Sequence, residues 1–222
     1  MPLNIAIDGP AGAGKSTLAK AAAKELGCIY VDTGALYRAV GLFALRRGAD
    51  PGDAAAVLPL LPLIEISLQF AENGQRVFLN GEDVSEAIRT PEASDASSKV
   101  SSHPAVRSFL LDLQRDLAAK NNVVMDGRDI GTVILPNAQV KIFLTASPEE
   151  RARRRWRELV EKDTTARFED VLAAILERDA RDSSRAAAPL KPAPDSILLD
   201  TTGLDFSQSL EGLLKIAGKA AK

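Results

Sequence analysis

The chain has 222 residues, of which 45% are apolar, and a formal net charge of −2 at pH 7. That length and apolar content suit a single compact α/β domain with an insertion, which can bury a sizeable core. Proteins that bind nucleic-acid phosphates usually carry a basic excess, so the charge balance argues against nucleic acid as a partner.

The apolar runs are too short to cross a membrane, because a helical span needs about 20 consecutive apolar residues. The run Leu3–Ile7 is also too short for a signal peptide, and no basic segment precedes it. Cys28 is the single cysteine, which excludes an internal disulfide and suits a reducing compartment. We expect it to be buried as a small hydrophobe. We therefore expect a cytoplasmic protein with no membrane partner. A monomer is the expected oligomeric state, although no sequence pattern determines it.

Short apolar runs rich in Ile, Val and Leu recur along the chain, and helical patterns separate most of them. Runs of this kind are typical of strands buried in a parallel sheet. The sequence therefore predicts an α/β fold with a doubly wound parallel sheet of five strands. The predicted strands are Leu3–Asp8, Cys28–Thr33, Asn122–Asp126, Gln139–Ala146 and Ser196–Thr201.

A phosphate-binding loop (P-loop) follows the first predicted strand. Residues Gly9–Ser16 match the pattern Gly-x-x-x-x-Gly-Lys-Ser/Thr, and a helical segment follows from about Lys15. In such a loop, backbone N–H groups and the helix N-terminus form a pocket for phosphates. Lys15 is expected to reach the β- and γ-phosphates of a nucleotide, and the Ser16 hydroxyl to ligate Mg²⁺. Asp126 closes the third predicted strand and is expected to hold the same ion through water.

Two helices are marked by the glycines that follow them. Gly27 and Gly48 come after helical segments that begin near Lys15 and Ala35, and glycine is favoured just past a helix end. The alanine-rich tail after Ser207 is predicted to form a short amphipathic helix at most.

Residues 64–84 alternate apolar and polar side chains and contain the turn pairs Asn73-Gly74 and Asn80-Gly81. This pattern predicts a small antiparallel sheet inserted between the second and third core strands. Residues 104–120 return to a helical period. His103 precedes that helix, and we expect it to be structural or exposed, with no acid–base role.

The segment Ser147–Glu150 has the Ser, Pro and Glu pattern of a helix start. An arginine cluster, Arg151–Arg157, follows it, and a longer helix is predicted at Phe168–Arg185. The cluster could be an ordinary exposed helix face. It could instead belong to a lid, at residues 149–165, that closes on a triphosphate and excludes water.

Other arginines point to a second anion site. Arg38 and Arg128 follow the second and third strands, where open α/β sheets bind ligands. Arg178, Asp182 and Arg185 are spaced to share one helix face, a pattern that a solvated set of ion pairs would also give. A hydroxyl acceptor of a phosphoryl group needs a base, whereas a phosphate acceptor is mostly dianionic and needs cations instead. The arginine surplus therefore favours transfer to a phosphate.

These motifs together resemble the nucleoside monophosphate kinases, and within that group the bacterial-type cytidylate kinases. The motifs are IDGPAGAGKST, DTGALYR, NGEDVSEAIRT, DGRDIGTV, KIFLTAS, ERARRR and ERDARDSSRAAAPL, which run from residue 5 to about residue 190. Members of this family transfer the γ-phosphoryl group of Mg·ATP reversibly to CMP or dCMP, in pyrimidine nucleotide metabolism. The resemblance implies ATP and CMP or dCMP as substrates, and Mg²⁺ as cofactor.

The resemblance also implies roles for individual residues. ATP would bind Gly9, Pro10, Ala11, Gly12, Ala13, Gly14, Lys15, Ser16 and Thr17, together with Arg154 and Arg155 in the lid. CMP would bind Thr33, Arg38, Ser98, Arg107, Gly127, Arg128, Asp129, Arg178, Asp182 and Arg185. Catalysis would depend on Lys15, Arg128, Arg178 and Arg185, and the metal on Ser16 and, through water, Asp126. Many relatives have Ser where Thr33 stands, so the preference between ribose and deoxyribose stays open.

The domain organisation that follows is a single kinase domain over residues 1–222. The parallel-sheet core comprises residues 1–33, 121–148 and 166–222. The monophosphate-binding region comprises residues 34–120, with the antiparallel insert at about 62–100, and the lid comprises residues 149–165.

Two other functions share part of the pattern. A kinase of a hydroxyl-bearing metabolite, such as a sugar, would have the loop and the lid. It would need an aspartate base in place of the arginine surplus, and it would not need the insert. A nucleotide switch or non-catalytic binding module would fit Asp200–Gly203, which matches the D-x-x-G of GTPases, but the sequence contains no Asn-Lys-x-Asp motif.

Overall fold

The computed structural model describes residues 1–71, 74–161 and 165–220. Within these residues the strands form a parallel sheet in the order β2-β6-β1-β7-β8 and an antiparallel sheet in the order β3-β4-β5. The parallel sheet consists of β1 (Asn4–Asp8), β2 (Ile29–Asp32), β6 (Val123–Gly127), β7 (Val140–Thr145) and β8 (Ile197–Asp200). The prediction of a doubly wound parallel sheet with an antiparallel insert is confirmed.

The parallel sheet is buried at its centre and exposed at one edge. Ile5 and Ile7 of β1 and Met125 of β6 are fully buried, since helices cover both faces of the sheet there. Ile197 and Leu198 of β8 are 47% and 64% exposed. The prediction that all the strands are buried is therefore wrong for β8, which pairs with β7 and forms the outer edge of the sheet.

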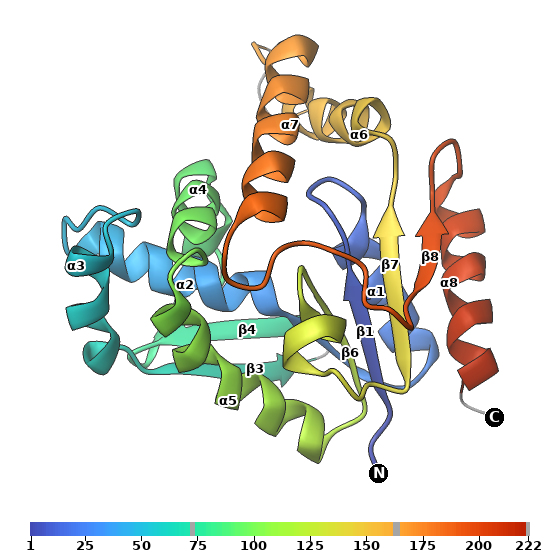
Figure 1. Ribbon diagram of the computed structural model, residues 1–222, viewed down its shortest axis with the longest axis horizontal. Helices are drawn as coiled ribbons and strands as arrows, with labels where there is room; N and C mark the ends of the chain where they lie inside the picture. The colour runs from blue at the N-terminus through green and yellow to red at the C-terminus, as the bar shows by residue number, and fades with distance from the viewer. Residues whose placement is uncertain (72–73, 162–164, 221–222) are drawn as a thin grey trace.

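Helices cover both faces of this sheet (Figure 1). On one face lie α1 (Lys15–Glu25) and α8 (Phe206–Ala220). On the other lie α5 (Pro104–Lys120) and the π-helical turn η3 (Ile130–Ile134). Because the strands all point the same way, their carboxyl ends meet at one edge of the sheet, which is the upper edge in Figure 1.

The C-terminal tail is more ordered than its sequence predicts. α8 has 15 residues, and its Leu213 and Ala217 are buried in a cluster with Leu18 and Ala22 of α1. The prediction of a short helix at most is wrong, because it did not include the apolar face of α1 that α8 covers. The predicted helix-end glycines are confirmed, since Gly27 and Gly48 have φ values of 62° and 68°.

The inserted region has an apolar core of its own, in which Val40, Leu79 and Leu110 are buried together. Asn80 and Gly81 both have positive φ, 50° and 82°, as the predicted hairpin turn requires. Of the other predicted turn pair, Asn73 lies outside the described residues. The elements of the region are α2 (Thr33–Arg46), α3 (Ala54–Val57), η1 (Leu58–Leu63), β3 (Ile66–Ala71), β4 (Gly74–Leu79), β5 (Glu82–Asp83), η2 (Ala87–Arg89) and α4 (Pro91–Val100).

Two further helices stand above the carboxyl ends of the strands, α6 (Pro148–Val160) and α7 (Phe168–Ser184) (Figure 1). The Ser147 hydroxyl accepts a hydrogen bond from the Glu150 N–H at 3.2 Å, which confirms the predicted start of α6. Arg185 follows α7 in an extended conformation, with φ −61° and ψ 140°. The prediction that Arg185 continues the helix face is therefore wrong, because the chain turns away one residue earlier.

Two isolated residues also have defined places. His103 is buried, and its Nε2 lies 2.9 Å from the Pro51 carbonyl oxygen, so its role is structural, one of the two outcomes predicted for it. Cys28 is only partly buried, packing beside the cluster under α1, and this burial raises the pKa of its thiol.

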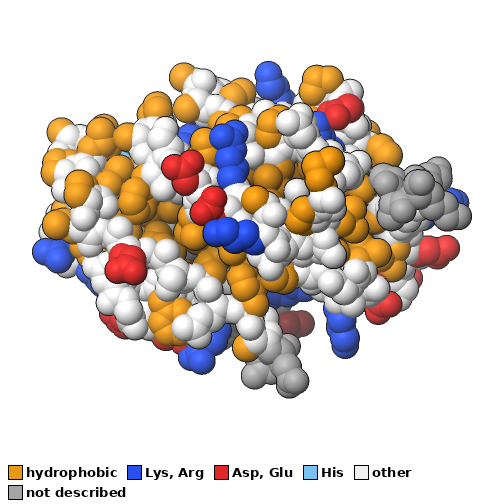
Figure 2. All heavy atoms as spheres, turned by 90° about the horizontal axis from the view of Figure 1, so that it is seen from below, with side chains coloured by type: hydrophobic (Ala, Val, Ile, Leu, Met, Phe, Trp, Pro, Cys, Tyr) orange, Lys and Arg blue, Asp and Glu red, His pale blue; other side chains and the backbone are white. Residues whose placement is uncertain are grey.

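The face of the molecule seen in Figure 2 carries no single gathering of charge. Lys and Arg side chains are scattered there among Asp and Glu, with apolar side chains between them. Among the described residues, no helix combines the length and the apolar character that crossing a membrane requires.

Candidate active site

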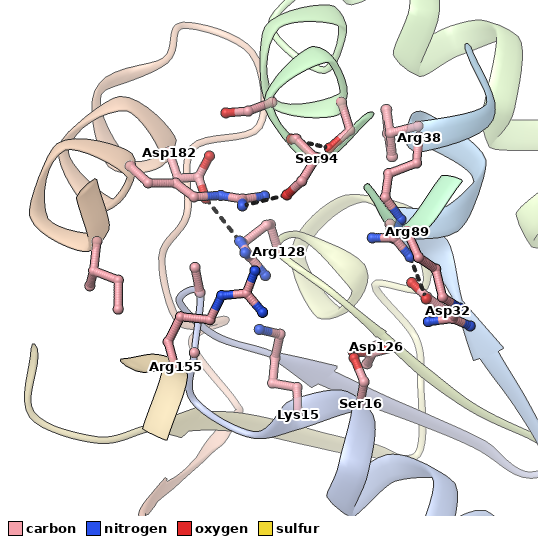
Figure 3. A pocket seen from close by; sticks show the side chains of 18 of the residues that line it. Lys15, Ser16, Asp32, Arg38, Arg89, Ser94, Asp126, Arg128, Arg155 and Asp182 are labelled. Atoms are coloured by element: carbon pink, nitrogen blue, oxygen red, sulfur yellow. Dashed lines mark hydrogen bonds and ion pairs between the residues drawn. The ribbon is translucent and has the colours of Figure 1, made fainter. Parts of the chain in front are cut away.

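A cleft of about 1060 Å³ opens at the carboxyl ends of the parallel strands. The loop after β1 forms its floor, and side chains from α4 and α7 line its sides (Figure 3). This is the edge of an open α/β sheet where ligands generally bind.

Glycines shape the floor of the cleft. A Cβ on Gly9 would lie 1.9 Å from the Leu144 carbonyl oxygen, so only glycine lets the loop pack against β7. Gly12 and Gly14 have positive φ, 73° and 84°, and Gly14 caps α1. The predicted ATP-binding residues that line the cleft are Ala11, Gly12, Gly14, Lys15, Ser16 and Thr17, whereas Gly9, Pro10 and Ala13 are not part of its lining.

Lys15 enters the cleft with its charge poorly compensated. Its side chain is buried, and Nζ donates a hydrogen bond to the Pro10 carbonyl oxygen at 2.8 Å. Burial, followed by repulsion from Arg128, holds the pKa of Lys15 well below its ordinary value. A polyphosphate in this position would reverse that effect, because an anion stabilises the charged ammonium group.

Ser16, in the first turn of α1, lies beside Asp126, near the end of β6. The Ser16 hydroxyl donates to Asp126 Oδ2 at 2.9 Å, and the Tyr30 hydroxyl donates to Asp126 Oδ1 at 2.9 Å. Burial, followed by the charge of Asp32, raises the pKa of Asp126 to about 6. A hydroxyl and a carboxylate oxygen beside a phosphate loop are hard ligands of the kind that Mg²⁺ shares with substrate phosphates and water. The residues present therefore fit a magnesium site.

Two arginines of the second anion site, Arg38 and Arg128, are each held by an acidic side chain. Arg38 Nη2 lies 2.7 Å from Asp32 Oδ2. Arg128 Nε donates to Asp182 Oδ2 at 2.9 Å (Figure 3). Each carboxylate offsets part of the charge and fixes the direction in which the planar guanidinium group points.

Two further guanidinium groups, those of Arg107 and Arg185, are less exposed and lie around Asp129. Arg107 donates a hydrogen bond to Asp129 Oδ2, and Arg185 Nη2 lies 3.9 Å from Asp129 Oδ1. Arg178 donates to the Ser94 hydroxyl at 3.2 Å, while burial and then repulsion from Arg128 lower its pKa to about 10. These cations repel one another, so an anion bound among them would relieve the repulsion.

Several buried polar atoms that belong to cleft-lining residues have no hydrogen-bond partner in the part of the chain that the structure describes. They are Arg38 Nε, Ser98 Oγ, Arg178 Nε and Arg185 Nη2. Leaving buried donors unpaired costs free energy, and native structures keep few of them without a reason. A ligand with several acceptor oxygens would satisfy them together.

All the predicted CMP-binding residues line this one cleft. They are Thr33, Arg38, Ser98, Arg107, Gly127, Arg128, Asp129, Arg178, Asp182 and Arg185. In the structure, the Thr33 hydroxyl donates to the Asp126 carbonyl oxygen at 2.8 Å. A Cβ on Gly127 would lie 2.7 Å from the same hydroxyl, so a larger residue at this position would displace the Thr33 side chain.

The predicted lid arginines occupy different environments. Arg155 lines the cleft and pairs with Glu158 at 2.9 Å. Arg154 stands outside the described lining and donates to the Thr201 carbonyl oxygen at 2.8 Å. Arg151 is buried, and it donates to the Ala11 carbonyl oxygen at 3.0 Å and to Asp179 at 2.6 Å. Arg151 therefore ties α6 and α7 to the phosphate loop and does not lie on an exposed helix face.

Asp8 supports the site from outside the cleft lining, and the sequence pattern did not reveal this role. Its Oδ1 and Oδ2 accept hydrogen bonds from the backbone N–H groups of Ile130 and Gly131, each at 2.7 Å. Asp8 thereby holds the turn that carries Arg128 and Asp129. Burial outweighs these two donors and raises the pKa of Asp8 to about 6. The partners lie 122 and 123 residues away, so no local pattern could mark this carboxylate.

This shift predicts how stability depends on pH. Because the folded-state pKa of Asp8 lies above its unfolded value of 3.8, the folded protein binds this proton more tightly. The resulting stability is complete below the unfolded pKa and is lost as pH rises through about 6. Asp8 should therefore account for a loss of about 1.4 kcal/mol between pH 5 and pH 7.5. Denaturant unfolding should be measured at both pH values for the wild type and for Asp8→Asn. The difference between their free energies of unfolding should change by that amount from one pH to the other. A difference that is the same at both pH values would contradict the prediction.

Comparisons with known proteins agree on one family. A family model described as Cytidylate kinase matches residues 5–219. A cytidylate kinase of Carboxydothermus hydrogenoformans is 50% identical over 217 residues, which cover 98% of each chain. A cytidylate kinase of Caldanaerobacter subterraneus subsp. tengcongensis is 50% identical over 222 residues, covering 100% of this chain and 97% of the relative. A solved structure of an uncharacterized protein from Eubacterium ventriosum has a similar fold, with a TM-score of 0.55 and 13% identity over 99% of both chains.

Proposed function

The chain belongs to the cytidylate kinase family, and we propose that it transfers the γ-phosphoryl group of Mg·ATP reversibly to CMP and dCMP, giving CDP and dCDP. It is thus a phosphotransferase of the nucleoside monophosphate kinase type, as the sequence motifs predict. The less favoured alternative is a kinase of a hydroxyl-bearing metabolite.

One observation carries this proposal: four partly buried guanidinium groups face the phosphate loop across a single cleft. Arg38, Arg128, Arg178 and Arg185 all line it, opposite Lys15. A neutral hydroxyl acceptor would leave these cations repelling one another, whereas an acceptor phosphate offsets their charge. The acceptor phosphate is mostly dianionic near neutral pH and needs no base to attack.

The base would lie near Ser98, Arg107 and Asp129, which are among the more buried residues of the cleft lining. A carboxylate can accept a hydrogen bond from the exocyclic amino group of cytosine, and a guanidinium group can donate to its ring nitrogen or carbonyl oxygen. The unpartnered hydroxyl of Ser98, within the described residues, supports a further contact there. Arg178 and Asp182 would lie beside the sugar.

In the transfer, an oxygen of the acceptor phosphate forms a bond to the γ-phosphorus of ATP. The bond from that phosphorus to the bridging oxygen breaks, and ADP leaves with the electron pair. Lys15, Arg128, Arg178 and Arg185 would offset the negative charge that gathers on the transferred group. Mg²⁺, held by Ser16 and through water by Asp126, would supply further charge neutralisation at the phosphates.

We propose that residues 149–165 act as a lid, with Arg155 on the side that faces the cleft. Residues 162–164 of this segment lie outside the described residues. The core would comprise residues 1–33, 121–148 and 166–222, and the monophosphate-binding region residues 34–120. Closing the site limits hydrolysis of ATP, because water competes with the acceptor.

We also propose that the protein acts as a monomer in the cytoplasm. Residues of this one chain supply every side chain assigned to either substrate, which supports a monomeric enzyme. A single cysteine suits a reducing compartment.

Steady-state kinetics with CMP, dCMP, UMP and AMP tests the function. We expect kcat/KM for CMP to exceed that for AMP by about 100-fold or more, since the smaller pyrimidine pairs with the polar groups of the cleft. ATP consumption with a sugar alcohol or shikimate-like acid, and none with CMP, would overturn the proposal in favour of the hydroxyl-directed alternative.

A further inference from the structure

We propose that Gln75, on the inserted sheet, positions Arg38 for the acceptor phosphate by holding the backbone of Asp32. The inference rests on the proposed function, because it assigns Arg38 to that phosphate. Gln75 itself is a positioning residue, acting through another side chain.

The side-chain amide of Gln75 forms hydrogen bonds with both main-chain polar groups of Asp32. Its Oε1 accepts a hydrogen bond from the Asp32 N–H at 2.9 Å, and its Nε2 donates to the Asp32 carbonyl oxygen at 3.3 Å. Asp32 ends β2, the outer strand of the parallel sheet. Edge strands leave such groups unpaired, so this side chain occupies the place that another strand would take.

Asp32 passes this constraint on to the acceptor site. Its Oδ1 accepts a hydrogen bond from the Ala35 N–H at 3.0 Å, which caps α2. Its Oδ2 receives Nη2 of Arg38 at 2.7 Å. Because the carboxylate follows its own backbone, a shift of Asp32 would move both the start of α2 and the guanidinium group.

Arg38 has little room to adjust independently. A Cβ on Gly34 would lie 3.0 Å from Arg38 Nη1 and 3.1 Å from Asp32 Oδ1. The ion pair between Arg38 and Asp32 therefore packs directly against the backbone of Gly34. Arg38 Nε is buried and has no hydrogen-bond partner among the described residues. Asp32 thus holds Nη2 of the guanidinium group, and Nε remains as a donor for the acceptor phosphate.

The chemistry of the amide explains why glutamine fits this position. A glutamine offers one acceptor and two donors, as the N–H and the carbonyl of Asp32 require together. Glutamate of the same shape could accept but not donate, and it would place a second carboxylate beside Asp32. The isosteric change should therefore disturb Arg38 more than removal of the side chain does.

Steady-state kinetics and CMP titration of Gln75 variants test the inference. Gln75→Ala should raise KM and Kd for CMP about fivefold, and Gln75→Glu about tenfold or more. The kcat and the KM for ATP should change by less than about twofold, because the phosphate loop is not touched. Gln69→Ala is the matched control, an exposed glutamine of β3 in the same sheet, and it should leave all constants unchanged.

A double-mutant cycle separates positioning from general destabilisation. If Gln75 acts through Arg38, Gln75→Ala should add less than about twofold to the KM for CMP in an Arg38→Ala background. Additive effects, or equal losses for ATP and CMP, would overturn the inference. If the wild type phosphorylates CMP and Gln75→Ala has the same KM and Kd for CMP, the inference about Gln75 is overturned but the proposed function stands. A wild type that neither binds nor phosphorylates CMP would instead overturn the proposed function, and this inference with it.

Discussion

Replacing Lys15 with methionine should lower kcat about a thousandfold, the upper end of what one preorganised charge donor contributes to a transition state. Methionine keeps an unbranched apolar stem but removes the ammonium group. The charge of Lys15 is poorly solvated in the folded protein, since the side chain is 7% exposed. A cation in such an environment interacts strongly with the charge that develops on the transferred phosphoryl group. Turnover at saturating ATP and CMP is the measurement.

The same substitution should not destabilise the fold. Burial and the neighbouring Arg128 already disfavour the charged form of Lys15 and lower its pKa, so removing the charge relieves a cost. We expect the thermal midpoint of Lys15→Met to equal or exceed that of the wild type. Lys24→Met, an exposed change in the last turn of the same helix and outside the cleft lining, is the control and should keep near-normal turnover. A kcat for Lys15→Met within tenfold of the wild type would contradict the assignment.

Replacing Arg128 with alanine should lower kcat/KM for CMP about 100-fold, which corresponds to about 3 kcal/mol for a lost charged contact. Arg128 lines the acceptor side of the cleft and is oriented by Asp182. Binding of ATP should remain nearly intact, because the loop that holds its phosphates is formed by other residues. Calorimetric titration with ATP, beside kinetics with varied CMP, measures the two effects separately.

The Arg128→Ala substitution also affects Asp182, the acidic partner of Arg128. Burial opposes ionisation of Asp182, but the charge and hydrogen bond of Arg128 outweigh it and hold the pKa of this carboxyl below its ordinary value. Arg128→Ala removes that support and leaves a buried carboxylate less well compensated. Arg128→Lys restores the charge without the planar fork and should recover only part of the activity. If ATP affinity fell as much as CMP affinity, the assignment of separate donor and acceptor sites would be wrong.

Local sequence patterns were sufficient for most elements of the fold. Each apolar run predicts a strand because a buried strand must be apolar along its length, and Gly14 and Gly27 stand where the chain needs positive φ. The same patterns were insufficient for β8 and α8. Whether an apolar strand lies at the centre or at the edge, and whether a weak helix is covered, depends on which elements pack beside it.

In the candidate site, too, local sequence patterns predicted some residues and missed the partners of others. The phosphate loop is contiguous, and its chemistry can be read from the eight residues Gly9–Ser16. The acceptor arginines could be located at strand ends, but their acidic partners could not. Arg128 meets Asp182 across 54 residues, and Tyr30 meets Asp126 across 96.

The sequence by itself thus determined the elements, the loop and the kinds of charge at the sheet edge, because backbone preference and side-chain periodicity act between near neighbours. The tertiary structure alone decided that Asp8 holds the start of η3, that Arg151 is buried, and that Gln75 pairs with Asp32. Those contacts depend on strand register and on burial, which raises the cost of every unpaired polar group and so selects partners that are distant in the chain.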